Sequence, residues 1–161
     1  MIRRAMPGDA EAVVRILRES RAQAMPWLPV LHTPEEDSGL FSRALAGEAY
    51  VFELQGAVAG FMVLGELLDG FYVAPEAQRR GVGTALFSRA KEERPDGFEF
   101  WVFRDNHRAR RFYESHGARF LYETDGSNNE ERTPDVRYEW RPSGSVRQVG
   151  PPSPLDSSAA S

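Results

Sequence analysis

Residues 71–86 read Phe-Tyr-Val-Ala-Pro-Glu-Ala-Gln-Arg-Arg-Gly-Val-Gly-Thr-Ala-Leu, an apolar strand followed by a short loop and a helix that opens at two glycines. The first backbone N–H groups of a helix have no partner within it and carry the positive end of its dipole, so they form a binding site for an anion. Gly81 and Gly83 have no Cβ to keep a phosphate from this backbone, and Arg79 and Arg80 add positive charge beside it. The pattern predicts a phosphate-binding turn.

The sequence on either side of this turn predicts a mixed α/β domain. Periodicity and start signals place helices over 10–25, 34–45, 83–93 and 106–116, and strands over 49–54, 58–64, 67–73, 98–103, 118–123 and 136–140. Asp9 is expected to cap the first helix, and Thr33-Pro34-Glu35-Glu36 supplies the cap, proline and capping-box glutamate of the second. This order predicts an α/β (α+β) fold with a mixed, mostly antiparallel central sheet flanked by helices.

The composition limits the classes of protein that this chain can represent. Its 161 residues are enough for one domain, expected over 1–141, and residues 142–161, mostly Pro, Ser, Gly and Ala, are expected to be a disordered tail. The net charge of −4 argues against a broad surface for nucleic acid or anionic lipid. No apolar run is long enough to cross a bilayer, and the first 14 residues are too charged for a signal peptide. A soluble, cytoplasmic protein without nucleic-acid or membrane partners is therefore expected.

Metal and thiol chemistry are not expected. Cysteine is absent, which removes thiolate catalysis and thiolate metal ligands. The three histidines, His32, His107 and His116, lack the spacing that would place two of them on one helix face.

Three classes of ligand use glycines at a helix start. A Walker A loop is excluded, because Gly83 is followed by Thr84 without the required lysine. A dinucleotide fingerprint is disfavoured, since Leu86 stands where a third glycine or alanine is needed and the turn is not the first strand-to-helix turn of the chain.

The third class is given by a family resemblance. Gln78-Arg79-Arg80-Gly81-Val82-Gly83 resembles the Gln/Arg-x-x-Gly-x-Gly/Ala motif of the GNAT superfamily of N-acetyltransferases, whose backbone amides bind the pyrophosphate of acetyl-CoA. The preceding segment 68–73 resembles the family's central strand. Residues 106–118, Asn-His-Arg-Ala-Arg-Arg-Phe-Tyr-Glu-Ser-His-Gly-Ala, resemble a second family signature. The resemblance covers most of the chain before the tail, and its specific part lies between Leu68 and Phe120.

The resemblance implies acetyl-CoA (coenzyme A) as cofactor and a set of residues that bind it: Tyr72, Val73, Gln78, Arg79, Arg80, Gly81, Val82, Gly83, Thr84, Asn106 and Ala109. Asn106 also suits a helix cap. Arg104, Arg108, Arg110 and Arg111 cluster near the second motif, where a solvated helix face is favoured over contact with the 3′-phosphate or adenine.

The resemblance also implies catalytic and acceptor-binding residues. Tyr113 is the expected general acid, because a phenol stays protonated at neutral pH and can donate to a departing thiolate, although packing in the core also accounts for it. The resemblance assigns the general base to no position of this chain. Glu66 and Asp69, which flank the start of the central strand, are the nearest candidates, and solvated carboxylates at a strand end are the alternative. Trp27, Leu31 and His32 are expected to shape the acceptor pocket, and packing against the sheet is the alternative for Trp27.

The expected function is an N-acetyltransferase that transfers the acetyl group to a primary amine by direct attack, since no cysteine can carry an acyl intermediate. The alternative is a non-catalytic acyl-CoA-binding or regulatory module of the same fold. The sequence leaves open whether the acceptor is a small molecule or a peptide, and also the acyl-chain length. The oligomeric state is open too, a homodimer being the commonest soluble assembly.

Overall fold

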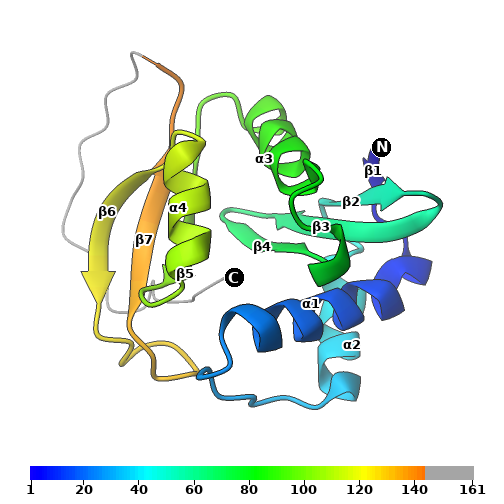
Figure 1. Ribbon diagram of the computed structural model, residues 1–161, viewed down its shortest axis with the longest axis horizontal. Coiled ribbons are helices and arrows are strands. Elements are labelled where there is room, and N and C mark those ends of the chain that lie inside the picture. The colour runs from blue at the N-terminus through cyan, green and yellow to red at the C-terminus, as the bar shows by residue number, and fades with distance from the viewer. Residues whose placement is uncertain (144–161) are drawn as a thin grey trace.

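The structure is a computed structural model that describes residues 1–143, so the expected tail lies outside it except for its first two residues (Figure 1). The elements, with 3₁₀ helices marked η, are β1 (Ile2–Arg4), η1 (Pro7–Asp9), α1 (Ala10–Ala24), α2 (Pro34–Ala44), β2 (Ala49–Leu54), β3 (Ala57–Leu64), β4 (Leu68–Val73), η2 (Pro75–Ala77), α3 (Val82–Glu93), β5 (Phe98–Phe103), α4 (His107–Ser115), β6 (Arg119–Thr124) and β7 (Asp135–Trp140). None of the helices in this part of the chain is long and apolar enough to cross a membrane.

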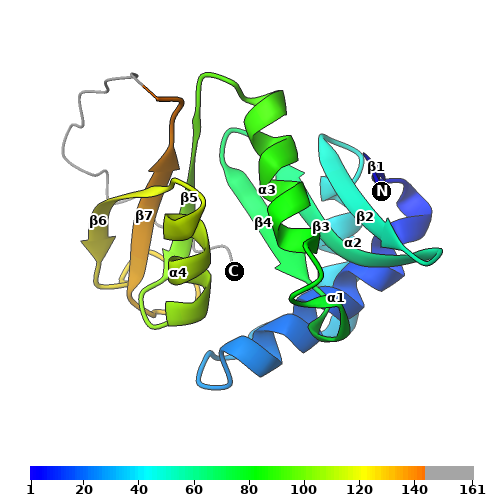
Figure 2. The same ribbon diagram turned by 45° about the horizontal axis from the view of Figure 1, so that its top comes forward.

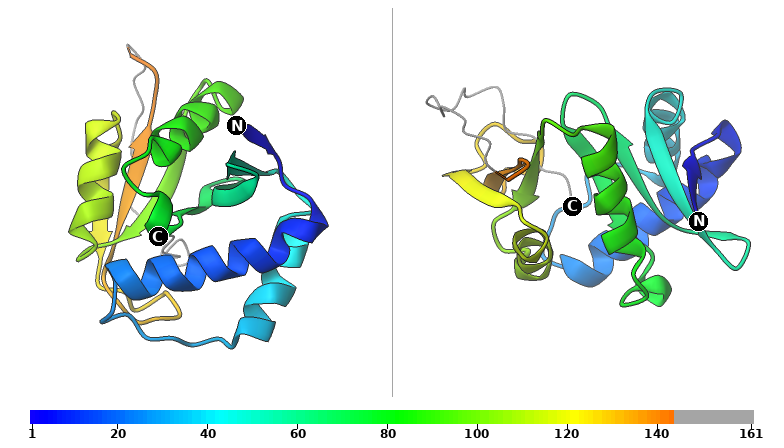
Figure 3. Two further views of the ribbon diagram at one scale, coloured as in Figure 1. Left: turned by 45° about the vertical axis from the view of Figure 1, so that its right-hand side comes forward. Right: turned by 90° about the horizontal axis from the view of Figure 1, so that it is seen from above.

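The strands form two antiparallel sheets, ordered β1-β2-β3-β4 and β5-β7-β6. Successive side chains of β4 point to opposite faces of the first sheet. On one face Tyr72 meets α1, and on the other Phe71 meets α3 through Phe87, with ring centroids 6.0 Å apart. Figure 3 shows α1 and α2 on one side of this sheet and α3 on the other, while α4 covers the second sheet. The predicted α/β class, antiparallel strands flanked by helices, is confirmed.

The two sheets meet at β4 and β5, which contact each other without a ladder of hydrogen bonds. Helix α3 carries the chain back between them, so both strands run in the same direction (Figure 2). An aromatic cluster fills the junction: Tyr113 of α4 lies 4.5 Å from Phe100 of β5 and 5.7 Å from Phe71 of β4, measured between ring centroids. The carboxyl end of β4 and the starts of α3 and α4 are thereby held around one place.

The start of α2 is confirmed in detail, and the start of α1 differs from the prediction. The Thr33 hydroxyl accepts a hydrogen bond from the Glu36 amide (3.2 Å), and the Glu36 carboxylate accepts one from the Thr33 amide (3.1 Å). The prediction that Asp9 caps α1 is wrong, because its side chain accepts from the Met6 amide (2.7 Å) and from Arg3 (2.8 Å). The bond from Arg3 is the main reason why the pKa of Asp9 lies below its usual value.

The structure predicts a stabilising substitution at Gly39, on the exposed side of α2. A Cβ built there meets only the Arg43 guanidinium, at 3.9 Å. Replacing a helix-interior glycine by alanine removes backbone entropy from the unfolded chain, so Gly39→Ala should add roughly 0.5–1 kcal/mol of stability. Thermal denaturation should show a rise in Tm of about 2–4 °C per kcal/mol. Gly56→Ala is the control: it also has open space but a φ of +80°, so its Tm should fall. A fall for Gly39→Ala would contradict the assignment of its environment.

Candidate active site

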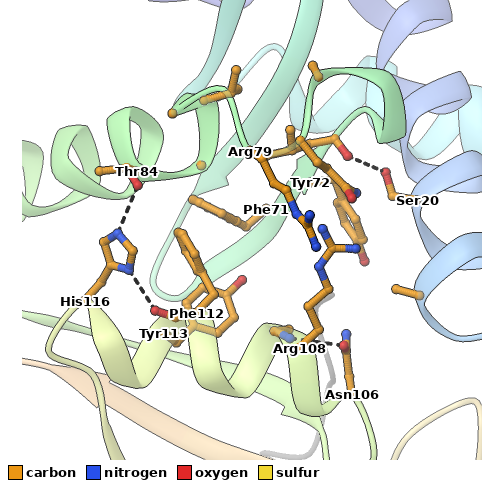
Figure 4. A pocket seen from close by; sticks show the side chains of 18 of the residues that line it. Ser20, Phe71, Tyr72, Arg79, Thr84, Asn106, Arg108, Phe112, Tyr113 and His116 are labelled. Carbon is orange, nitrogen blue, oxygen red and sulfur yellow. Dashed lines mark hydrogen bonds between the residues drawn. The ribbon is translucent and has the colours of Figure 1, made fainter.

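A cavity of about 400 Å³ lies where the end of β4, the start of α3, α4 and the end of α1 come together (Figure 4). Of the residues that the sequence assigned to the cofactor, all but Arg80 line it: Tyr72, Val73, Gln78, Arg79, Gly81, Val82, Gly83, Thr84, Asn106 and Ala109. Tyr113 lines the same cavity, whereas Arg80 is exposed outside it. Helix α1 is held against this end of β4 by the Ser20 hydroxyl, which donates to the Val73 carbonyl (2.9 Å).

The start of α3 has the geometry of an anion site. Gly81 precedes the helix with a φ of +82°, and no side chain caps its first amides within residues 1–143. The first backbone bond that closes the helix runs from the Ala85 amide to the Gly81 carbonyl (3.0 Å). A Cβ built on Gly81 meets nothing within 4 Å, so open space lies over this backbone. A diphosphate therefore fits here as the sequence predicts.

Gly83 is small for a second reason that the sequence did not indicate. A Cβ on Gly83 would lie 3.3 Å from the Phe112 ring and 3.6 Å from Val73. Glycine at this position thus lets α3 approach α4 closely, in addition to clearing the cavity.

Two arginines face each other across the cavity. Figure 4 shows the side chains of Arg79, from the loop before α3, and Arg108, from α4, pointing toward one another. In residues 1–143 no carboxylate pairs with either guanidinium. The nearby Arg104 instead pairs with Asp105 (2.9 Å), and Arg110 donates to the Tyr138 hydroxyl (3.0 Å). Arg108 is exposed, as a solvated helix face requires, and it also lines the cavity.

The second motif supplies the opposite wall. The Asn106 side chain accepts from the Ala109 amide (3.3 Å) and so caps α4 while lining the cavity. Tyr113 is 2% exposed, and Figure 4 shows its hydroxyl directed into the cavity. Its ring packs in the core, and its polar end borders the cavity.

His116 links the two walls, a role that sequence reasoning missed. Its Nε2 lies 3.0 Å from the Thr84 hydroxyl on α3, and its Nδ1 lies 2.8 Å from the Phe112 carbonyl on α4. When Nδ1 carries the proton and donates to the carbonyl, Nε2 accepts a hydrogen bond from the Thr84 hydroxyl. Its position four residues after Phe112, on the same helix face, was the signal available in the sequence.

A second cavity, of about 540 Å³, lies between α1, the loop before α2 and Glu131 of the loop between β6 and β7. Leu31 and His32 line it. Trp27 does not; it is 45% exposed and packs edge-on against Phe103, 6.5 Å between ring centroids. Arg21 lines this cavity and donates through Nε to the hydroxyl of Tyr72 in the first cavity (3.2 Å), so the two cavities adjoin.

His32 joins the two loops that border the second cavity. Its Nε2 lies 3.0 Å from Glu130, and its Nδ1 lies 3.6 Å from Glu36. The hydrogen bond to Glu130 is the main reason why the pKa of His32 is raised.

Glu66 and Asp69, the candidates for the general base, line neither cavity. They lie at the start of β4, whereas its last three residues, Phe71, Tyr72 and Val73, line the first cavity. Partial burial and the charge of Glu66 raise the pKa of Asp69, and Arg137 opposes the shift.

The chain is similar to known acetyltransferases in sequence and in structure. A family model described as the acetyltransferase (GNAT) family matches residues 11–118. The peptidyl-lysine N-acetyltransferase YiaC of Escherichia coli (strain K12) is 28% identical over 118 residues, which are 71% of this chain and 80% of YiaC. The solution structure of apo-form YjaB from Escherichia coli matches with a TM-score of 0.73 and 22% identity, over 87% of this chain and 96% of YjaB. The PaiA N-acetyltransferase of Thermoplasma acidophilum, crystallised with coenzyme A, matches with a TM-score of 0.71 and 18% identity, over 88% and 98%.

These similarities identify an acyltransferase. The chain belongs to the acetyltransferase (GNAT) family, whose model spans more than half of its length. The cofactor of this family is acetyl-CoA, and the open backbone at Gly81 with the unpaired arginines beside it fits the diphosphate of that molecule.

Proposed function

We propose that this protein transfers the acetyl group of acetyl-CoA to a primary amine of a small molecule or peptide by direct attack. The observation that carries the proposal is that the uncapped start of α3 and the Tyr113 hydroxyl border one cavity. A ligand whose diphosphate binds at α3 can extend along the cavity toward Tyr113. The name of the relative YiaC adds a lysine side chain in a peptide as one acceptor to examine.

Acetyl-CoA supplies a thioester as the acetyl donor. In the proposed transfer the neutral amine bonds to the acetyl carbon, the carbon–sulfur bond breaks, and the amine nitrogen gives up one proton to solvent water. Tyr113 donates its phenolic proton to the departing sulfur and then regains one from solvent. The absence of cysteine agrees with a single direct transfer. Glu66 and Asp69 are not part of this proposal, because a base must reach the amine directly or through one water.

Two measurements test the proposal. Calorimetry should show binding of acetyl-CoA, and a thiol assay should show release of free CoA only when a suitable amine is present. Binding without release of CoA, across a broad panel of amines, would support the non-catalytic acyl-CoA-binding module instead. No binding at millimolar acetyl-CoA would exclude both.

Arg79 and Arg108, which face each other across the first cavity, give a prediction on cofactor affinity. Arg108→Gln should weaken acetyl-CoA binding by about tenfold to a hundredfold, because a charge-assisted hydrogen bond contributes roughly 1.5–3 kcal/mol. Calorimetry measures the effect, and Arg111→Gln is the matched control, since Arg111 is an exposed arginine of the same helix outside the cavity. Acetyl-pantetheine, which lacks the diphosphate, should bind both variants equally. An equal loss of affinity for acetyl-pantetheine would show that Arg108 does not act on phosphate.

A further inference from the structure

Glu131 has an unusual environment for a carboxylate. It lies in the loop between β6 and β7 and lines the cavity of about 540 Å³, yet its side chain is only 11% exposed. Its ion-pair partner is Arg21, at 3.8 Å, which is beyond hydrogen-bond distance. A carboxylate removed from water is costly unless donors satisfy its lone pairs. The carboxylate oxygens of Glu131 can therefore accept hydrogen bonds from a molecule in the cavity.

The other carboxylates that line this cavity are already satisfied. Asp37 accepts from Arg18 (2.7 Å), and Glu19 accepts from Arg15 (3.0 Å). Arg18 is used in turn, because it also donates to the His32 carbonyl (3.0 Å). Glu131 is therefore the one carboxylate bordering this cavity to which the structure gives no hydrogen-bond donor within residues 1–143.

The rest of the cavity selects the kind of group that can approach Glu131. Apolar side chains from α1 and the loop before α2 form much of its wall, among them Leu17, Met25, Leu28 and Leu31. Met25 also lines the cofactor cavity, and the Arg21–Tyr72 hydrogen bond spans the boundary between the two. A molecule in the second cavity is thus adjacent to the cofactor cavity.

We infer that Glu131 binds the ammonium group of the incoming acetyl acceptor, and that the acceptor is a primary alkylammonium whose aliphatic stem lies on the apolar wall. The bound ammonium loses one proton to solvent before the neutral amine attacks the thioester. An ammonium carries three donors and no acceptor, which complements a carboxylate without donors. This inference rests on the proposed function and names the substrate class of the same reaction. It makes Glu131 a specificity-determining residue that the sequence did not indicate.

The test compares Glu131→Gln with Glu11→Gln, using n-butylamine, which is charged at pH 7.5, and aniline, which is neutral there. Glu131→Gln should raise the KM for n-butylamine by about tenfold to a hundredfold, the value of a charge-assisted hydrogen bond. The KM values for aniline and for acetyl-CoA should change less than about twofold, because neither molecule brings an ammonium group to Glu131. Glu11 is exposed on the first turn of α1 and lines neither cavity, so Glu11→Gln should leave the KM for n-butylamine unchanged.

A binding measurement separates this inference from the proposed function. Calorimetric titration of n-butylamine into the complex with CoA should give heat for the wild type and none for Glu131→Gln, whether or not turnover occurs. Equal effects of Glu131→Gln on n-butylamine and aniline would overturn the inference, because loss of a structural contact does not depend on the charge of the acceptor. A wild type that acetylates aniline and neither binds nor acetylates n-butylamine would also overturn it, while the proposed function would stand.

Discussion

Replacing Tyr113 by phenylalanine is expected to lower kcat by about 10²–10⁴-fold, the usual contribution of general acid catalysis. The Kd of acetyl-CoA should stay within about twofold of the wild-type value, because the backbone at α3 is untouched. The protein should fold, since phenylalanine keeps the ring contacts with Phe71, Phe87 and Phe100. Steady-state kinetics with a saturating amine gives kcat, and calorimetry gives the Kd.

The control for this variant is Tyr138→Phe. Tyr138 is also buried and aromatic, and burial is the main reason why its pKa rises to about 12, but it lines neither cavity. Its hydroxyl bonds to Arg110 and Glu114, so the control should lose stability while keeping kcat within a few-fold. An acetyl thioester whose thiol is much more acidic than that of CoA can lose a thiolate without help from a general acid. Such a donor should restore much of the rate that Tyr113→Phe loses. An unchanged kcat with acetyl-CoA would remove Tyr113 from the role of general acid.

The fold was predictable wherever the deciding signal was local. The capping box at Thr33 and the glycines before α3 act within one turn of chain, and both helices start within one residue of the predicted position. Strand β1 was missed because its three residues, Ile2–Arg4, are too few for an alternating pattern. Its existence depends on pairing with β2, about 50 residues away, which a local pattern does not encode.

The residues of the site also fall into two groups, those with a local signal in the sequence and those placed by the fold. The predicted cofactor residues came from the helix start and from the family resemblance, and all but Arg80 line the cavity. The one-turn spacing of Ala109 and Tyr113 places both on one face of α4. The base candidates, Glu66 and Asp69, were chosen for lying near the central strand, but they lie at its start. The cofactor cavity is lined by residues at its other end, Phe71 to Val73. Arg108 and Glu131 acquire their roles from which carboxylates or donors the fold leaves near them, and sequence spacing carries no information on that.

Gly83→Trp is expected to abolish acetyl-CoA binding, with a loss of affinity greater than about 100-fold, or roughly 2.7 kcal/mol. Even a Cβ at this position lies 3.3 Å from the Phe112 ring, so α3 and α4 leave no room for an indole except in the cavity itself. There it would fill the space over the amides at the start of α3. Calorimetry at millimolar acetyl-CoA should show no heat of binding.

The interpretation requires that the variant folds, because the indole also presses on the aromatic cluster around Phe112. Gly8→Trp is the control for added bulk: a Cβ on Gly8 meets nothing within 4 Å and Gly8 is outside the cavity, so binding should persist. If thermal denaturation shows that Gly83→Trp is unfolded, Gly81→Ala replaces it. Its methyl enters open space over the same amides, at a backbone cost of about 1–2 kcal/mol for the φ of +82°. Wild-type affinity in a folded Gly83→Trp or Gly81→Ala protein would mean that the diphosphate does not bind at the start of α3.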